Sequence, residues 1–363
     1  MGQNRDGAPE LTVGLDLGDR HCEICILDEG GAVVERGKVR TEELALRRRF
    51  GGMERVRVIL EVGTHSPWIS RLLSEVGHEV VVANPRKLRL IYENPRKTDR
   101  ADAEYLARVG RMDPELLAPV AHGGRQVQAD RGVLRARERL VRIRGQLVNH
   151  VRGTVKSWGA RLPSCGAATF ARRVGEEIPE ALRPSLDPLV RQIEAISQEI
   201  KALDEQIERL CEERYPETRL LRQVPGVGPK MSLCFILTVE DPDRFRRSRD
   251  VGPYLGLVPR QDDSGSRERR GRITKTGDKM CRRLLVQSAQ YILGPFGPDC
   301  DLRRWGERII ERGEARGKKH AAVAVARKLA VLLHRLWVTG EIYEALRAGG
   351  PGGIEEEASL AMA

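Results

Sequence analysis

The chain has 363 residues, enough for two compact domains and a connecting element, which excludes a single small disulfide-stapled module. Its formal net charge is +11 and lysine and arginine recur along the whole length, so a nucleic acid is the natural partner, because each neutralised phosphate releases a condensed counterion. Aromatic residues make up only 4% of the chain, which argues against a sheet-borne stacking platform and for contacts to backbone and grooves.

No apolar run approaches the roughly 20 residues that a membrane-spanning helix needs. We therefore expect a protein without membrane contact, in the cytoplasm and associated with the nucleoid. The seven scattered cysteines are expected to be reduced thiols. Cys22 and Cys25 have the spacing of a zinc knuckle, but they lie in a strand-like run with no second pair nearby, so we do not favour a metal role for them.

The first region, residues 1–112, is predicted to be an α/β domain. Three β-rich runs are joined by tight turns, and strands and helices then alternate, which is the order of an RNase H-like sheet. The expected strands are 11–17, 22–28, 31–38, 56–61 and 79–83, and the expected helices are 41–49, 67–76, 86–94 and 99–109.

The remainder of the chain is predicted to be all-α. After a Pro/Gly-containing linker at 113–128, residues 129–215 are expected to form long helices. Within them, apolar residues from Leu189 to Leu210 alternate spacings of four and three over three heptads, as in a coiled-coil seam. This pattern fits an intramolecular helical hairpin or a contact with another protomer, and we favour the second. A mostly helical domain at 216–345 and a disordered tail at 346–363 complete the prediction.

Four carboxylates are candidates for a metal site. Asp16 ends the first predicted strand and Glu61 ends the fourth, positions that meet at one edge of such a sheet, and Asp99 and Asp102 share one face of a helix. Oxygen donors of this kind suit Mg²⁺, the cofactor that we expect for phosphoryl transfer. Alternatively, Thr98 or Asp99 is a helix N-cap and Asp102 an ordinary first-turn acid. Asp16 in Gly-Leu-Asp-Leu-Gly also fits an actin-like ATPase, although no second phosphate loop follows.

Residues 220–239 contain a Val-Pro-Gly-Val-Gly-Pro-Lys turn between two predicted helices, as in a helix-hairpin-helix motif. Gly226 and Gly228 allow backbone N–H groups to approach a phosphate at the start of the next helix, beside Lys230. The competing interpretation is a plain packing corner between two helices.

Ser264 is a candidate nucleophile. It lies in an Asp-Ser-Gly segment within a basic stretch, where cations can hold a scissile phosphate and stabilise its developing charge. An ordinary turn explains the same tripeptide. The basic residues expected to bind nucleic acid here are Arg260, Arg267, Arg269, Arg270, Arg272 and Lys275.

Taken in order, these motifs resemble the DEDD transposases of the insertion-sequence 110 family over roughly residues 11–340. The resemblance implies an RNase H-like (RuvC-like) domain in which Asp16, Glu61, Asp99 and Asp102 bind Mg²⁺. It implies that Ser264 attacks DNA to give a covalent phosphoserine intermediate. It also implies donor and target DNA and a structured non-coding guide RNA as partners. A further implication is a homo-oligomer, dimer or tetramer, in which the serine domain of one subunit completes a site with the carboxylate domain of another.

One departure and two rival functions stay open. After Glu61 the chain reads Val-Gly-Thr-His-Ser-Pro-Trp, where many relatives have a Thr-Gly-x-Tyr pattern, so no role is assigned to His65 or Ser66. The first rival is a structure-specific endonuclease, like a Holliday-junction resolvase, that uses the same carboxylates with water as the nucleophile. The second is a nucleic-acid-binding scaffold without catalytic activity.

Overall fold

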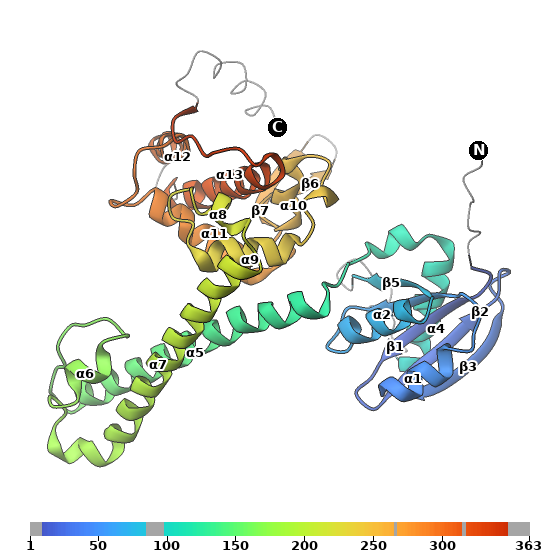
Figure 1. Ribbon diagram of the computed structural model, residues 1–363, viewed down its shortest axis with the longest axis horizontal. Helices are drawn as coiled ribbons and strands as arrows, with labels where there is room; N and C mark the ends of the chain where they lie inside the picture. The colour runs from blue at the N-terminus through green and yellow to red at the C-terminus, as the bar shows by residue number, and fades with distance from the viewer. Residues whose placement is uncertain (1–8, 85–97, 265–266, 314–316, 348–363) are drawn as a thin grey trace. The chain divides into compact units, whose positions relative to one another are not determined.

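The computed structural model describes residues 9–84, 98–264, 267–313 and 317–347, and the side chains of 261–270 lie outside this description. The chain divides into two compact units, 1–124 and 125–363. Figure 1 shows a mixed α/β first unit and a mainly helical second unit. The division falls inside the predicted linker. The helix expected at 86–94 and the tail from residue 348 are outside the described residues.

The first unit is built on a five-stranded sheet of order β3-β2-β1-β4-β5. Strands β1 (Thr12–Leu17), β4 (Arg57–Glu61) and β5 (Glu79–Ala83) are parallel, whereas β2 (His21–Leu27) and β3 (Val33–Arg40) pair antiparallel. The strands lie where the sequence pattern predicts them, with β3 shifted two residues toward the C-terminus.

The two faces of this sheet carry different helices. On one face, α1 (Glu43–Phe50) and α2 (Ser66–Glu75) pack on a core that includes Val13 and Leu15, both fully buried. The opposite face is covered by α4 (Asp99–Met112). Side chains alternate between the faces of a strand. Residues two apart, such as Gly14 and Asp16, therefore both lie on the α4 face.

The same alternation separates Cys22 and Cys25. Cys22 packs with the α1–α2 core, and Cys25 packs against Ala103 and Ala107 of α4. Because the two thiols lie on opposite faces of the sheet, they are not placed to share a metal ion. All seven cysteines are free, and the two are buried.

The second unit begins with a hairpin of two long helices, α5 (Arg125–Ser157) and α7 (Arg183–Glu213). Arg137 pairs with Asp204 at 2.6 Å, and Arg144 donates to Ser197 at 3.2 Å, so the helices run antiparallel. The long helix starts at Arg125, four residues before the predicted start. Its first turn reads Arg-Gln-Val-Gln, which carries too few apolar residues to reveal a helical period in the sequence.

The rest of the second unit is a helical domain around α9 (Pro229–Val239), whose last nine residues are all buried. Helix α9 contacts α5, α7, α8 (Thr218–Leu221) and α11 (Lys279–Ile292). The domain also contains α10 (Val251–Tyr254), α12 (Asp301–Arg312) and α13 (Gly317–Thr339). The prediction of an all-α second region is wrong at one place, where β6 (Pro259–Ser264) and β7 (Arg267–Ile273) form an antiparallel hairpin. No helix among the described ranges has the length and apolar character to cross a membrane.

Candidate active site

Asp16 and Glu61 lie side by side at the carboxyl ends of two parallel strands. Leu15 of β1 is in register with Leu60 of β4, and each carboxylate follows directly. Neighbouring strands are about 4.8 Å apart, so the two residues occupy adjacent positions at one sheet edge. Both lie on the face that α4 covers, two residues beyond Gly14 and Ile59 respectively.

Helix α4 brings the other two carboxylates to this edge. A Cβ added to Gly14 would lie 1.9 Å from the carbonyl oxygen of Ala103, so α4 approaches β1 backbone to backbone. Thr98 is the N-cap, because its hydroxyl accepts a hydrogen bond from Ala101 N at 3.2 Å. Asp99 is therefore not the cap. Asp99 and Asp102 occupy the first turn, where acids also favour the helix dipole.

The other three carboxylates all act on Asp16. Burial, then the charges of Asp99, Asp102 and Glu61, raise the pKa of Asp16 from 3.8 to about 6. A hydrogen bond from the backbone of Leu17 opposes this shift. Asp16 therefore lies in a region of negative charge to which Glu61, Asp99 and Asp102 contribute.

The carboxylates do not form a closed ligand set. Among the described residues, no group of three or more His, Cys, Asp or Glu side chains is arranged to hold a metal ion. The donors are all carboxylate oxygens, the type that hard divalent cations such as Mg²⁺ prefer.

A fifth carboxylate, Glu23, was not singled out in the sequence. Its backbone is directly opposite Asp16 in the β1–β2 register, which places it on the α4 face. The Glu23 side chain is 14% exposed and forms a 2.5 Å ion pair with Lys38 of β3. The alternation of side chains along β2 could have identified Glu23, because Glu23 and Cys25 lie on the same face of the strand.

His65 and Ser66, whose roles were open, lie at the start of α2 just beyond Glu61. The indole of Trp68 donates to Nδ1 of His65 at 3.1 Å, which leaves Nε2–H to donate to Asp19 at 3.2 Å. Ser66 is fully buried and donates to the carbonyl of Gly63 at 2.9 Å. Ser66 therefore stabilises the β4–α2 turn, whereas His65 and Asp19 border the carboxylate edge.

The glycine turn before α9 has two parts with different surroundings. Gly226 has a φ of +77°, and a Cβ there would lie 2.9 Å from the Tyr291 ring and 3.0 Å from the carbonyl oxygen of Ser288. Packing against α11 thus accounts for Gly226. Gly228 is the exposed N-cap of α9 with nothing near its Cβ position, and Lys230 lies 3.8 Å from Asp204.

Ser264 ends β6 and is paired with Arg267, the first residue of β7. The base of this hairpin is fixed by Arg282, which donates to the carbonyls of Leu255 at 2.9 Å and Thr276 at 2.5 Å. The predicted basic residues are distributed over both strands and the following loop. Arg260, Arg272 and Lys275 are exposed, and Arg269 and Arg270 lie in β7 with Arg267.

Comparisons with known proteins match both units. Residues 218–299 match the family described as "Transposase IS116/IS110/IS902 family", and residues 13–158 match a DEDD family described as "Transposase". A "Putative transposase y4pF/y4sB" of Sinorhizobium fredii is 30% identical over 318 residues, which cover 83% of this chain and 80% of that protein. The chain belongs to this family of insertion-sequence transposases.

Two further relatives extend the comparison. The transposase is 28% identical to the "Transposase for insertion sequence element IS1111A" of Coxiella burnetii, over 91% of this chain and 90% of that protein. It is 25% identical to the "Pilin gene-inverting protein" of Moraxella bovis, over 75% and 76% of the two chains. The resemblance inferred from the motifs is confirmed, and the chain is a DNA transposase.

Proposed function

We propose that this transposase cuts and rejoins DNA by Mg²⁺-dependent phosphoryl transfer, with Asp16, Glu61, Asp99 and Asp102 as metal ligands and Ser264 as the nucleophile. The observation that carries the proposal is the adjacent placement of Asp16 and Glu61 at the carboxyl ends of β1 and β4, supported by the raised pKa of Asp16, to which Asp99 and Asp102 in the first turn of α4 contribute. Bound there, Mg²⁺ supplies neutralisation of the charge that develops on the phosphate oxygens.

The strand arrangement supports an RNase H-like (RuvC-like) assignment for the first unit. Three antiparallel strands, β3-β2-β1, are followed by the parallel strands β4 and β5, and a helix lies on each face. In this arrangement the carboxyl ends of β1 and β4 present Asp16 and Glu61 together, as the chemistry requires.

The serine step is a transesterification. The Ser264 hydroxyl loses its proton as its Oγ bonds to phosphorus, and one bridging P–O bond of the DNA breaks, so that the displaced DNA oxygen takes up a proton and leaves as a hydroxyl. The phosphoserine ester keeps the energy of the broken bond, so the reverse attack by a DNA hydroxyl rejoins a strand. The cations proposed to bind the phosphate are Arg260, Arg267, Arg269, Arg270, Arg272 and Lys275. A relative named for gene inversion supports rejoining, because inversion leaves no strand cut.

The turn before α9 is proposed as a second, backbone-directed contact to nucleic acid. Gly228 is open at the start of the helix, where N–H groups favour an anion, and Lys230 lies beside it. Gly226 belongs to the same turn, but it acts through the turn conformation because its near side is filled by α11.

The hairpin of α5 and α7 is proposed as a coiled coil that also contacts another protomer. Ile193, Ile200 and Ile207 are buried in the hairpin. The alternate seam residues Leu189, Ile196, Leu203 and Leu210 are only half-buried, which leaves apolar area for a further helix. Together with the family resemblance, this supports a homo-oligomer, dimer or tetramer, that binds donor and target DNA with a structured non-coding guide RNA.

One assay separates this proposal from its rivals. The purified protein is incubated with its RNA, insertion-sequence end DNA and Mg²⁺, and denatured samples are examined for protein joined covalently to DNA. We expect an adduct that Ser264→Ala abolishes and that Ser185→Ala, a change of an exposed serine in the first turn of α7, retains. DNA cleavage that survives Ser264→Ala contradicts the serine step and favours a water-dependent, resolvase-like nuclease. If a related transposase cleaves DNA under the same conditions and this chain does not, the result would favour a scaffold without catalytic activity.

A further inference from the structure

Figure 1 shows α6 at the end of the α5–α7 hairpin away from α9, and the sequence around this end is rich in cations. Residues 139–175, here called the basic segment, contain eight lysines and arginines and no aspartate or glutamate. It runs from the second half of α5 to just beyond α6 (Phe170–Val174). Its charge makes a polyanion the complementary partner, independently of the residues proposed above for catalysis.

The basic segment is a folded element with a core of its own. Val151, Val155, Phe170 and Val174 are fully buried with residues of α7. Arg152 stacks over the Phe170 ring at 5.0 Å and donates to the carbonyl of Pro163 at 3.1 Å, which fixes the loop after α5. The cations are therefore presented on an ordered surface.

Trp158 is displayed at the end of α5 in this surface. Its backbone N–H donates to the carbonyl of Thr154 at 3.1 Å, and Gly159 has a φ of +94°, so the helix ends in a fixed left-handed cap. The Trp158 residue is 58% exposed. Lys156 and Arg161, on either side of it, are exposed and make no ion pair within the described residues. An indole that contributes this little to the core is available to a partner.

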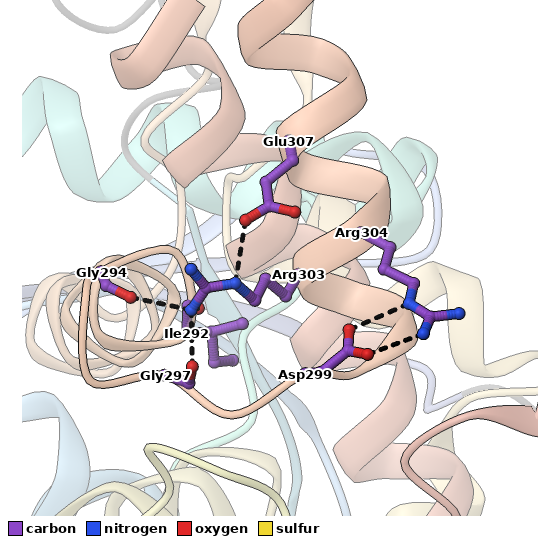
Figure 2. Close-up of polar contacts among 7 residues, drawn as sticks. All are labelled: Ile292, Gly294, Gly297, Asp299, Arg303, Arg304 and Glu307. Carbon is purple, nitrogen blue, oxygen red and sulfur yellow. Dashed lines mark hydrogen bonds and ion pairs between the residues drawn. The ribbon is translucent and has the colours of Figure 1, made fainter.

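Phe296 differs from Trp158 in the charges around it. Phe296 is 83% exposed, but the charged side chains beside its loop form ion pairs with one another. Figure 2 shows Arg303 bound to Glu307 at 2.8 Å and Arg304 bound to Asp299 at 2.6 Å, which neutralises the loop that carries Phe296. Arg303 also fixes this loop by donating to the carbonyls of Ile292, Gly294 and Gly297. Exposure and a rigid backbone are thus common to both aromatic residues, and only Trp158 adds an excess of cations.

We infer that the basic segment binds single-stranded DNA, with Trp158 stacking on an unpaired base and Lys156 and Arg161 contacting the adjoining phosphates. A duplex hides its base faces in the stack, whereas an unpaired base offers a face to an aromatic ring. The transposase acts on DNA, and strands that are exchanged must be unpaired while they transfer. The site thus goes beyond the catalytic proposal and does not depend on the identity of the nucleophile.

The test measures binding of the full chain to a fluorescently labelled single strand of about 20 nucleotides and to the matching duplex, by anisotropy. Base stacking on an aromatic residue is worth about 1–3 kcal/mol, so we expect Trp158→Ala to weaken single-strand binding roughly 5- to 150-fold and to leave duplex binding unchanged. Trp158→Phe should restore most of the affinity. Replacing Lys156 and Arg161 with glutamine should lower the salt dependence of log K by about 1.4, near 0.7 for each phosphate contact.

Phe296→Ala is the matched control, and it should bind both DNAs as the wild type does. Wild-type single-strand affinity in Trp158→Ala, or equal losses for single strand and duplex, would overturn the inference. A loss confined to an RNA strand of the same sequence would assign the surface to RNA instead. A changed oligomer mass in Trp158→Ala, with DNA affinity intact, would assign it to self-association.

Discussion

Asp16 is the residue at which the fold and the proposed chemistry oppose each other. A carboxylate that is partly removed from water and faces three others is costly to ionise, and its pKa of about 6 reflects that cost. Such an arrangement is retained at functional sites, where a cation reverses the balance of charge. In the absence of a cation, Asp16 should therefore weaken the folded state at neutral pH.

Replacing Asp16 with asparagine should stabilise the metal-free protein at pH 7.5. Because the folded-state pKa is raised above the unfolded value of 3.8, the contribution of Asp16 to stability is present below about pH 4 and is lost as the pH rises through about 6. We expect Asp16→Asn to gain on the order of 1–2 kcal/mol after allowance for solvent screening, roughly 3–6 °C in Tm. The difference in stability between Asp16→Asn and the wild type should disappear as the pH falls from 6 toward 4, as measured by thermal unfolding in EDTA.

Adding Mg²⁺ should invert this order. The wild type should rise in Tm with metal concentration, because a ligand that binds only the folded state stabilises it, and Asp16→Asn should rise much less. Glu54→Gln, which removes an exposed carboxylate elsewhere in the unit, serves as the control and should respond to Mg²⁺ like the wild type. An equal Mg²⁺ response in Asp16→Asn would count against Asp16 as a ligand.

The sequence predicts some of the candidate site residues but not others. Asp16 and Glu61 were predicted because each ends a recognisable strand, and parallel strands present their carboxyl ends together. Glu23 was missed because its approach to Asp16 depends on the antiparallel register of β2. Gly226 was predicted as a phosphate contact on the basis of local pattern, but its close neighbours come from α11, about sixty residues later in the chain.

At the scale of elements, the contact between α4 and β1 determines whether the carboxylates meet. Gly14 and Gly110 permit this contact, since a Cβ at Gly110 would lie 2.3 Å from Ile59 Cγ1. The helix therefore meets the β1 backbone directly at Gly14, and at Gly110 it packs against the Ile59 side chain of β4. Helix period and strand alternation predicted the elements, but this crossing depends on two glycines whose neighbours are distant in the sequence.

Replacing Gly14 with alanine should separate α4 from the sheet. The added Cβ would lie 1.9 Å from the carbonyl oxygen of Ala103, and a backbone atom cannot move aside as a flexible side chain can. We expect a loss of about 1–3 kcal/mol in the free energy of unfolding, measured with urea, which is the usual cost of overpacking. The displaced first turn of α4 should lower the yield of the covalent DNA adduct about 100-fold or more, since a shift near 1 Å can cost that much.

Gly52→Ala controls for the loss of glycine itself. Nothing lies within 4 Å of its Cβ position, so this variant should unfold and form adduct like the wild type. If Gly14→Ala retained both stability and adduct yield, the close approach of α4 to β1 would have no role in assembling the carboxylates.

At the scale of the whole molecule, the proposed chemistry is divided between two compact units. The carboxylates lie within residues 1–124, and Ser264 lies within residues 125–363. Each unit has its own hydrophobic core, one around the sheet and one around α9. The sequence predicted this division because the strand–helix alternation ends before the long helices begin, but it contains no local pattern that pairs a given serine with a given set of carboxylates.

Subunit mixing can determine that pairing. Asp16→Asn lacks a working carboxylate set and Ser264→Ala lacks the nucleophile, so each variant alone should form almost no recombined DNA. If one subunit supplies the carboxylates and another the serine, a mixed dimer contains one site with both wild-type parts. Equal mixing makes about half of the dimers mixed, so about a quarter of the wild-type sites should be restored. The amount of recombined product is measured after the two variants are co-expressed, so that their subunits assemble together.

Product at the background level of the separate variants would show that each site draws both parts from a single chain. The double variant Asp16→Asn/Ser264→Ala co-expressed with wild type provides the control, because its mixed dimers contain no fully wild-type site in the shared arrangement but one in the single-chain arrangement.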